Sequence, residues 1–530
     1  MGPRLIVLGW DSATFDVIDP LLDAGRLPAL ASLIERGTKA PLRSTWPPMT
    51  DCAWTSVFTG RNPGGHGIFG SWYRAPGSYA CRYYSSRDRR APALWELTQG
   101  ERHLVWNVPM AFPPNEIDGV MVAGYGAPPG STFCVPAEFQ SKLADKWPVE
   151  DLLDRAPHGS LEDFLADLLR GLETQADALI WAMRESGAEV VEAVWPHVDR
   201  AQHFFWSARG SEGPLGDAIE RVYEATDRAS GRIVEAFPDA DVIVISDHGA
   251  GPLHGDVNLG AWLAHRGDAA YGSGRRSLLA SLGWALPPAA RKAAKRVAPG
   301  LARRAVGASL TGQLGPFDWS RTTAFMGFHG DLWLNLRGRE PNGTVDPADA
   351  DGVLDGLTGD LLALGDPRRD EPVFAAVHRR DDIYSGPALG TAPDLMLDSW
   401  SNGYRVAPGR GPSREYVTDP HALSGVSEPW SSDHRPTGIL VAAGPHIARA
   451  GSIDALHLYD ICPTVLALIE SDVPADLDGR VATEVIDEGW LNDHPVRTGG
   501  STSPRASEPG YSGDEAAAVA EHLRDLGYIE

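Results

Sequence analysis

The sequence predicts an α/β fold with a mostly parallel central sheet and helices on both of its faces. Two observations support this class. Short apolar runs rich in β-branched residues recur along the chain, and helical patterns lie between them. A third observation indicates where the functional site lies, because acidic and imidazole side chains follow or flank these runs. Open α/β sheets bind ligands at the carboxyl ends of their strands, so we expect the functional site at that edge.

The strands are expected at short apolar runs. The first is RLIVLG at 4–9, and Asp11 and Ser12 follow at its end. The later runs are HLVWNV (103–108), GVMVAG (119–124), EVVEAVW (189–195), VIVI (242–245) and GILVAAG (438–444). Continuous apolar runs of this length are typical of strands that are covered on both faces.

Helices are expected between the strands, most clearly at 161–186 and 215–237. Residues 267–311 are basic and rich in alanine, and they predict a helical insertion. We favour a cap near the active site for this insertion; the alternatives are a solvated helical face or a face that contacts anionic lipid. The catalytic domain is predicted to span residues 1–488. Residues 489–530 are predicted to hold a flexible linker and a short C-terminal helix.

Composition restricts the class of protein. The net charge of −24 disfavours a general nucleic-acid binder, because the phosphate backbone would be repelled. No apolar run approaches the roughly 20 residues needed to span a bilayer, and no secretory signal pattern follows Met1. The four cysteines lack CxxC spacing, so neither a disulfide framework nor a thiolate zinc site is indicated. We expect a cytoplasmic enzyme that acts on a small molecule.

Acidic and imidazole side chains gather where the predicted strands begin or end. They are Asp11, Asp199, His203, Asp247, His248 and His434. Asp199 and His203 are four residues apart, which puts both on one face of a helical turn. An isolated Asp-His pair is more often a turn with a capping aspartate. As a set, however, carboxylate and imidazole ligands without thiolates suit zinc, manganese or iron.

The stretch WPPMTDCAWTSVFTG at 46–60 predicts a helix that starts near Thr50 and ends at Gly60. A hydroxyl at the start of a helix faces the positive end of the helix dipole, which favours an alkoxide and an incoming phosphate. Threonine is a weak nucleophile, but a metal at bonding distance would lower its pKa. The alternative is that Thr50 only caps the helix.

In this order and context, the motifs resemble the alkaline phosphatase superfamily, most closely its type I phosphodiesterase/nucleotide pyrophosphatase branch. The resemblance extends from residue 4 to about residue 485. It implies an alkaline phosphatase-like sandwich that binds two divalent metal ions. We expect Zn²⁺, with Mn²⁺ or Fe as alternatives. It implies that one ion is bound by Asp199, His203 and His434. The other would be bound by Asp11, Asp247, His248 and the oxygen of Thr50, which would also be the nucleophile.

The resemblance further implies hydrolysis of a phosphate ester through a phosphothreonine intermediate, as a phosphodiesterase or pyrophosphatase. Three alternatives stay open: a phosphatase that acts on a monoester, a phosphotransferase or mutase on the same scaffold, and a catalytically silent binding protein. Ser71 stands where this branch often has an asparagine that holds a phosphate oxygen. We also predict substrate contacts by His329 and Arg337, with a surface salt bridge as the alternative for Arg337.

Overall fold

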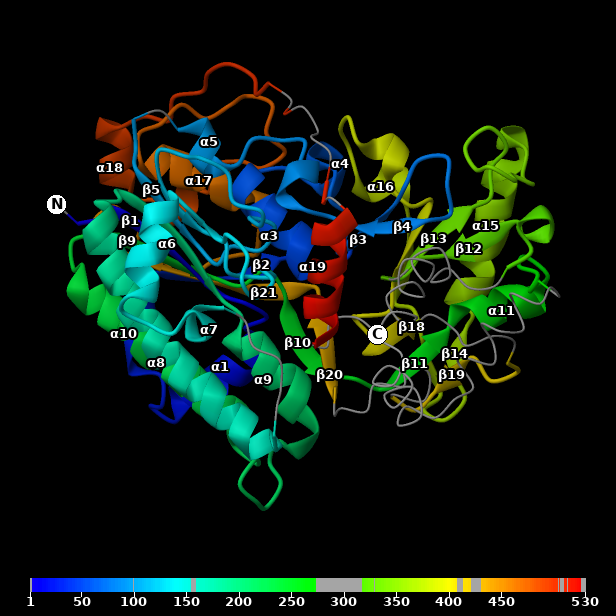
Figure 1. Ribbon diagram of the computed structural model, residues 1–530, viewed down its shortest axis with the longest axis horizontal. Helices are drawn as coiled ribbons and strands as arrows, with labels where there is room; N and C mark the ends of the chain where they lie inside the picture. Colours follow the sequence, from blue (N-terminus) through cyan, green and yellow to red (C-terminus); the bar gives the residue numbers. More distant parts are fainter. Residues whose placement is uncertain are drawn as a thin grey trace.

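The computed structural model describes residues 2–98, 100–153, 159–272, 317–327, 329–407, 413–420, 430–503, 505, 510–511 and 513–525. These residues form a larger lobe around a central sheet and a smaller lobe beside it (Figure 1). The predicted basic insertion lies outside the described residues from residue 273 onward.

The central sheet of the larger lobe has the order β22-β2-β21-β9-β1-β8-β5-β6-β7, with β23 beside β2. Its strands are β1 (Leu5–Trp10), β2 (Thr38–Arg43), β5 (His103–Trp106), β6 (Gly119–Val122), β7 (Cys134–Val135), β8 (Val190–Trp195), β9 (Asp241–Ile245), β21 (Thr437–Ala443), β22 (Gly451–Ser452) and β23 (Leu456–His457). Strands β9, β1, β8, β5 and β6 run parallel. This confirms the predicted mostly parallel sheet. The last predicted strand, β21, runs antiparallel to both of its neighbours.

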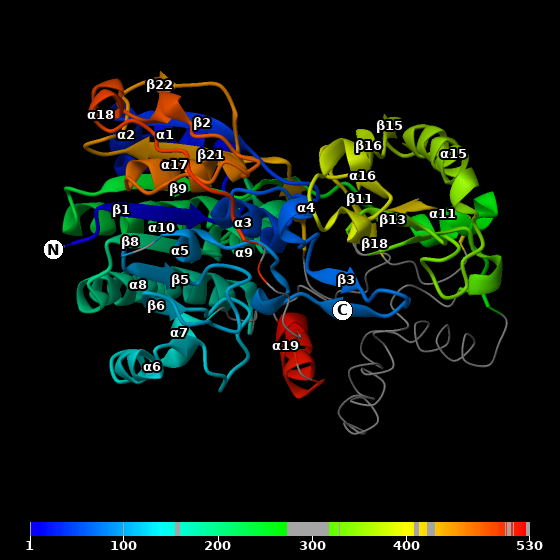
Figure 2. The same cartoon turned by 90° about the horizontal axis from the view of Figure 1, so that it is seen from above.

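Helices cover both faces of this sheet, which explains why β1, β8 and β9 are buried along their whole length (Figures 1 and 2). One face carries α1 (Phe15–Asp23), α2 (Pro28–Glu35), α8 (Leu161–Ser186), α9 (His197–Phe205) and α10 (Ala218–Ala236). The other face carries α3 (Thr50–Thr59) and α17 (Ile461–Leu468). Local signals set the bounds of α8: the Ser160 side chain accepts the Asp163 N–H, and Gly187 ends the helix with φ +62°.

The smaller lobe has its own sheets and its own apolar core. One sheet has the order β18-β11-β19 and the other β12-β13-β17-β16. The elements are β11 (Gly255–Asn258), β12 (Ala324–Met326), β13 (Asp331–Leu334), β16 (Ala376–Arg379), β17 (Leu395–Asp398), β18 (Tyr404–Ala407), β19 (Val417–Thr418), α11 (Leu259–Arg266) and α15 (Ala350–Leu362). Leu259, Leu332 and Leu397 are buried in this second core. The sequence analysis did not predict these strands, because they are short and lie outside the continuous apolar runs on which the predicted strands rest.

Short elements complete the chain and join the lobes. They are β3 (Trp72–Arg74), β4 (Cys81–Tyr83), α4 (Pro63–His66), α5 (Leu94–Leu97), α6 (Ala137–Ala144), α7 (Val149–Leu152), β10 (Gly249–Pro252), β14 (Gly365–Asp366), β15 (Glu371–Pro372), α16 (Arg380–Ile383), β20 (Ser432–Arg435), α18 (Glu488–Asp493) and α19 (Gly513–Asp525). The β3–β4 hairpin lies between the two lobes (Figure 1).

The segment after residue 488, predicted to be a flexible linker before a helix, makes specific contacts where it is described. The Arg505 N–H donates to the Arg90 carbonyl at 2.8 Å, and Arg505 also donates to the Ser86 carbonyl at 3.1 Å. The last described helix, α19, then lies at the front of the molecule between the lobes (Figure 1). The domain boundary at residue 488 stays a prediction.

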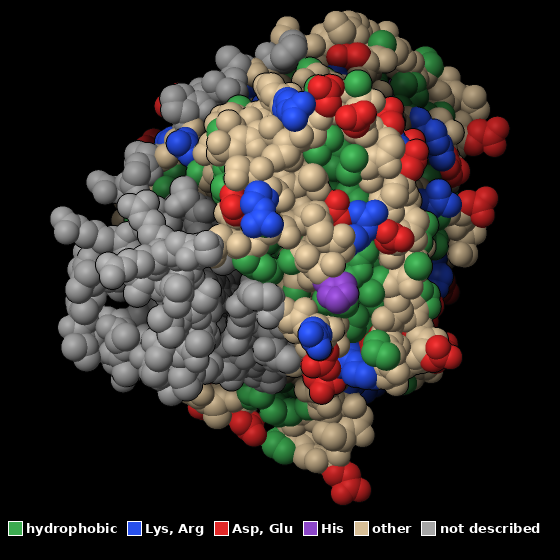
Figure 3. All heavy atoms as spheres, turned by 90° about the vertical axis from the view of Figure 1, so that its right-hand side faces the viewer, with side chains coloured by type: hydrophobic (Ala, Val, Ile, Leu, Met, Phe, Trp, Pro, Cys, Tyr) green, Lys and Arg blue, Asp and Glu red, His purple; other side chains and the backbone are tan. Residues whose placement is uncertain are grey.

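The outer face of the smaller lobe carries acidic and basic side chains side by side (Figure 3). Ion pairs of the smaller lobe include Arg379 with Asp351 at 2.7 Å and Arg369 with Glu371 at 3.0 Å. Among the described helices, none is both long and apolar enough to cross a membrane.

Candidate active site

The topology brings the predicted ligands to one edge of the central sheet. Strands β1, β8 and β9 are parallel neighbours, so their carboxyl ends meet there. Asp11 follows β1, Asp199 lies in the first turn of α9 after β8, and Asp247 follows β9. Because β21 is antiparallel to β9, it begins at this same edge. His434 lies in β20 just before β21 and therefore joins the others.

The first group consists of Asp199, His203 and His434, which are all buried. The Nε2 atom of His203 lies 3.1 Å from Oδ1 of Asp199 and 3.2 Å from Nε2 of His434. The distance from Nε2 of His434 to Oδ1 of Asp199 is 3.7 Å. One ligand atom from each residue can therefore meet at a single ion.

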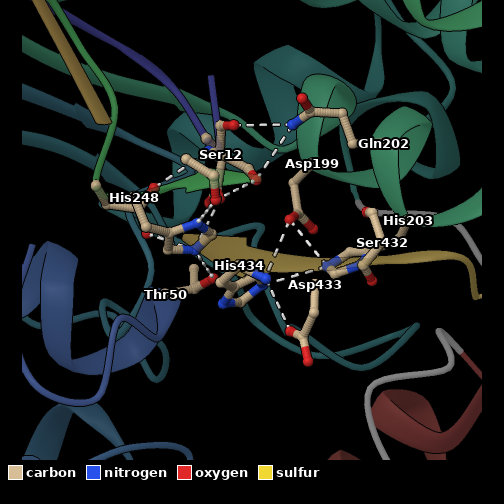
Figure 4. A network of polar contacts seen from close by, with 12 residues as sticks. Ser12, Thr50, Asp199, Gln202, His203, His248, Ser432, Asp433 and His434 are labelled. Atoms are coloured by element: carbon tan, nitrogen blue, oxygen red, sulfur yellow. Dashed lines mark hydrogen bonds and ion pairs between the residues drawn. The ribbon is translucent and has the colours of Figure 1, made fainter. Parts of the chain in front are cut away.

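The second group consists of Asp11, Asp247 and His248, which are also buried. The Nε2 atom of His248 lies 3.1 Å from Oδ2 of Asp247 and 3.9 Å from Oδ1 of Asp11. The hydroxyl oxygen of Thr50 lies 3.4 Å from the same nitrogen. The His248 and His434 rings stack with centroids 3.7 Å apart, so the two groups are direct neighbours (Figure 4).

Backbone carbonyls orient all three imidazoles. The Nδ1 atom of His248 lies 3.1 Å from the Gly249 carbonyl, that of His203 3.1 Å from the Ser432 carbonyl, and that of His434 2.8 Å from the Pro48 carbonyl. A carbonyl only accepts, so each Nδ1 must carry the proton and donate it. Each Nε2 then presents a lone pair to its group, as a metal ligand requires.

The carboxylates fit a cation as well. Oδ1 of Asp11, Oδ1 of Asp199 and Oδ2 of Asp247 are buried, and none has a hydrogen-bond partner within the described residues. A buried polar atom without a partner is costly. These three oxygens face the three Nε2 lone pairs, so the donor set suits two divalent ions with oxygen and nitrogen ligands.

The electrostatics agree with this interpretation. Burial, together with the negative charges of Asp247 and Asp199, holds the pKa of Asp11 well above its usual range. Burial also raises the pKa of Asp247. The pKa of Asp199 is lowered, because its contact with His203 outweighs its burial. Burial lowers the pKa values of His248 and His434, which keeps both imidazoles neutral near pH 7.

Thr50 is the first residue of α3, and Met49 rather than Thr50 occupies the N-cap position. The hydroxyl is therefore not used for capping. Gly60 ends the helix with φ +65°, as predicted. Gly9 in β1 allows α3 to pack closely, because a Cβ on Gly9 would lie 2.3 Å from the Trp54 ring. That contact places Thr50 beside the second group.

The sequence analysis missed several residues that hold the ligands. The indole N–H of Trp54 donates to Oδ2 of Asp11 at 3.1 Å. The backbone N–H of Ser12 donates to Oδ1 of Asp247 at 3.2 Å, and Ser12 has a φ of +67°. Gln202 donates to the Ser12 carbonyl at 2.8 Å (Figure 4). Only Trp54 had a signal in the sequence, since it lies one helical turn after Thr50.

Two of the three predicted substrate contacts lie beside the site. Ser71 donates a hydrogen bond to Asp51, the neighbour of Thr50. His329 comes from the smaller lobe, and burial lowers its pKa, although the neighbouring carboxylates of Asp331 and Asp433 oppose that shift. The structure does not bring Arg337 to the ligands: its side chain is 61% exposed and lies 3.6 Å from Asp346. This matches the predicted alternative of a surface ion pair.

Comparison with known proteins yields one family match and several structural matches. The family model described as "Type I phosphodiesterase / nucleotide pyrophosphatase" matches residues 5–423. Phosphonoacetate hydrolase from Sinorhizobium meliloti 1021, solved with phosphonoformate, aligns with a TM-score of 0.51 and 17% identity over 87% of this chain and 94% of that chain. Murine ectonucleotide pyrophosphatase/phosphodiesterase 5, in an inactive form with AMP, aligns with a TM-score of 0.49 and 13% identity over 92% of this chain and 100% of that chain. No curated protein sequence gave a significant match.

Proposed function

The chain belongs to the type I phosphodiesterase/nucleotide pyrophosphatase family, and from this premise we propose that it hydrolyses a phosphate diester or pyrophosphate with the Thr50 hydroxyl as nucleophile. The predicted resemblance and the predicted enzyme class, a phosphoric ester hydrolase, are thereby confirmed. The cytoplasmic location and the lack of general nucleic-acid binding stay predictions.

One observation carries the proposal: the Thr50 hydroxyl lies at the start of α3 and 3.4 Å from Nε2 of His248. A phosphate bound there would meet the backbone N–H groups of the first helical turn, which have no acceptor within the helix. The hydroxyl would then be within reach of the phosphorus atom. Neither a capping role nor a packing role requires this contact with His248.

We further propose two bound ions, most simply Zn²⁺, one for each group of ligands. Asp199, His203 and His434 would hold one ion, and Asp11, Asp247, His248 and Thr50 the other. When bound, a pair of divalent ions lowers the pKa of a coordinated hydroxyl and neutralises charge on the transferring phosphoryl group. The absence of thiolate ligands is compatible with Mn²⁺ or Fe as well.

The chain's residues would act in two half-reactions. In the first, the Thr50 oxygen forms a bond to phosphorus, the bond to the leaving alcohol breaks, and the alcohol departs with the proton that Thr50 lost. In the second, water attacks phosphorus, the bond to Thr50 breaks, and Thr50 regains a proton. The carbonyls of Gly249, Ser432 and Pro48 keep the three imidazoles oriented throughout.

The test compares Thr50→Ala with Thr59→Ala. Thr59 lies on the same helix, and its hydroxyl donates only to the Thr55 carbonyl at 2.7 Å. We expect Thr50→Ala to abolish turnover of mono- and diesters even at saturating zinc, while its unfolding midpoint stays unchanged. Thr59→Ala should keep nearly full turnover. Equal turnover in the two variants would show that Thr50 is not the nucleophile.

Product analysis in ¹⁸O-labelled water, with and without an added alcohol, addresses the alternatives. Hydrolysis puts one solvent oxygen into the released phosphate or phosphate monoester. Transfer to the alcohol would instead indicate a phosphotransferase. A protein that turns over no phosphoester with zinc or manganese bound would be a silent binding protein, and the proposed function would fail.

A further inference from the structure

A short two-stranded ladder carries one of the candidate metal ligands. Strands β10 and β20 pair antiparallel, with Ala250 opposite His434 and Gly251 opposite Asp433. The ladder lies where the two lobes meet (Figure 1). Each strand has only four residues, and a two-stranded ribbon of this size has little stability of its own. Other contacts must therefore hold the backbone of His434 in place.

Arg435, the last residue of β20, supplies such contacts on both strands of the ladder. Its Nη2 donates to the Pro252 carbonyl of β10 at 2.6 Å. Its Nη1 donates to the His434 carbonyl at 2.9 Å and to the Asp433 carbonyl at 3.3 Å. Because a guanidinium is planar and rigid, these bonds fix the end of β10 relative to the residue that carries the candidate ligand.

Two glycines leave room for the guanidinium. A Cβ on Gly251 of β10 would lie 2.6 Å from Nε of Arg435, and a Cβ on Gly403 of the smaller lobe would lie 2.9 Å from Nη2. Gly403 has a φ of +74°, and its carbonyl accepts the His254 N–H at 2.7 Å. The half-buried side chain of Arg435 therefore lies against a backbone segment from each lobe.

Charge does not explain this arrangement. Within the described part of the chain, Arg435 forms no ion pair. Three carboxylates act on it from a longer distance: Asp433, Asp16 and Asp398. Burial lowers the pKa of Arg435, although these carboxylates oppose that shift. A positive charge beside His434 would also repel a cation bound there, so any benefit to metal binding must come from the hydrogen bonds.

His434 is thus held at two points. Its ring is oriented by the hydrogen bond from Nδ1 to the Pro48 carbonyl at 2.8 Å, and its backbone by the bond from Arg435 at 2.9 Å. Its Nε2 lies 3.2 Å from Nε2 of His203 (Figure 4). Metal–ligand distances vary by only about 0.2 Å, so a small shift of this backbone would take the nitrogen out of reach of a shared ion.

We propose that Arg435 is a positioning residue for metal binding: its guanidinium holds the backbone of His434 so that Nε2 can join the other two ligands of the first group. Since Gly403 of the smaller lobe packs on the same guanidinium, the arrangement of the two lobes also affects this ligand. The inference rests on the proposed function, because it assumes that the first group binds a metal ion.

The experiment titrates the zinc-free full chain with zinc against a competing chelator and resolves two binding steps. His434→Ala identifies the step that belongs to the first group. Arg435→Lys keeps the positive charge, but a single amine cannot reach the carbonyls of both strands, and Arg435→Gln removes the charge as well. We expect both Arg435 variants to weaken zinc binding at the first group by about 10- to 100-fold, and at the second group by less than about threefold.

The two variants separate position from charge. If charge alone mattered, Arg435→Lys would bind zinc normally and Arg435→Gln would bind it more tightly. Arg339→Lys is the matched control, since the half-buried guanidinium of Arg339 donates to the Leu334 carbonyl within the smaller lobe at 2.7 Å. It should leave both zinc affinities unchanged.

Amide hydrogen exchange of the zinc-free protein is the second readout. Exchange over residues 249–252 and 432–435 should be at least about tenfold faster in Arg435→Lys than in the unchanged chain. Urea unfolding checks that each variant is folded, and Arg435→Lys carries the test by itself if Arg435→Gln does not fold. Exchange that does not change in Arg435→Lys would overturn the proposal.

The zinc titration distinguishes this proposal from the proposed function. If the unchanged chain binds two zinc ions and Arg435→Lys binds them equally well, the positioning role is overturned while the proposed function stands. Equal weakening of both steps, or tighter binding by Arg435→Gln, would overturn the positioning role in the same way. If the unchanged chain binds no zinc, both the positioning role and the proposed function fail.

Discussion

The two lobes differ in what they contribute. The larger lobe supplies all the candidate metal ligands and Thr50, from the ends of strands of up to seven residues and from adjoining loops and helices. The smaller lobe supplies no member of either ligand group, but it supplies His329, which lies near His434 and Asp433. The candidate metal ligands and nucleophile thus lie at a rigid sheet edge, whereas residues of both lobes surround the place where the substrate would bind.

Removing a ligand from the larger lobe should have the largest effect. We predict that Asp247→Asn lowers kcat/KM by about a thousandfold or more, because the second group loses one of its two charged ligands. The same change should raise the unfolding free energy of metal-free protein by about 1 kcal/mol, since it replaces a buried carboxyl whose pKa is raised. Turnover assays and urea unfolding check the two parts. Full turnover in the variant would show that the ligand assignment is wrong.

A positioning residue of the larger lobe should have an intermediate effect. Trp54→Phe removes the N–H that donates to Asp11, and we predict a loss of about 10- to 100-fold in metal affinity. Titration with zinc against a competing chelator measures it. Trp95→Phe is the matched control, since the indole N–H of Trp95 has no acceptor among the described residues. Equal losses in both variants would indicate a general packing effect instead.

Buried imidazoles of the larger lobe should make its stability depend on pH. Burial lowers the pKa values of His66 and His197 to about 3. Below pH 6.5 the unfolded chain takes up protons that the folded chain does not, so stability is highest above pH 6.5 and falls toward pH 3. Each imidazole contributes about 1.4 kcal/mol per pH unit over that range.

Urea unfolding between pH 7 and pH 4.5 measures this slope. His66→Gln should remove the contribution of one imidazole, since a glutamine side chain does not titrate. The Nε2 atom of His66 lies 2.9 Å from the Ser56 hydroxyl, a contact that a glutamine can partly replace. An unchanged slope in the variant would mean that His66 is protonated in the folded protein.

The smallest effect is expected on the surface of the smaller lobe. Arg337→Ala removes an exposed ion pair with Asp346, and we predict a change of less than about twofold in kcat/KM and at most 1 kcal/mol in stability. Steady-state kinetics on the preferred substrate checks this. A tenfold loss of kcat/KM would restore Arg337 as a substrate contact and would extend the site further into the smaller lobe.

The same comparison explains how much could be predicted from the sequence. The bounds of α8 follow from local signals, a capping serine at 160 and a glycine at 187. Asp11, Asp199 and Asp247 follow continuous apolar runs, so their shared edge could be predicted from the parallel sheet. His434 could be assigned only through the family resemblance, because its position depends on β21 running antiparallel.

The smaller lobe could not be predicted for a physical reason. Its strands have two to four residues and lie outside continuous apolar runs, and one of its pairings, between β11 and β18, joins segments far apart in the chain. The hairpin contact between Arg74 and Glu340 joins residues 266 positions apart. The residues next to each of them in the sequence do not indicate this pairing. Contacts of this kind depend on the tertiary fold.

The most direct test of the central claim is a rapid-quench experiment on the zinc-loaded protein. Mixing with a phosphodiester for milliseconds, quenching with acid and mapping the peptides by mass spectrometry would locate any covalently bound phosphoryl group. We predict a phosphoryl adduct on Thr50 in the peptide that contains residues 46–60, and none in Thr50→Ala. Turnover with no adduct on Thr50 at any quench time, or an adduct on another residue, would contradict the account.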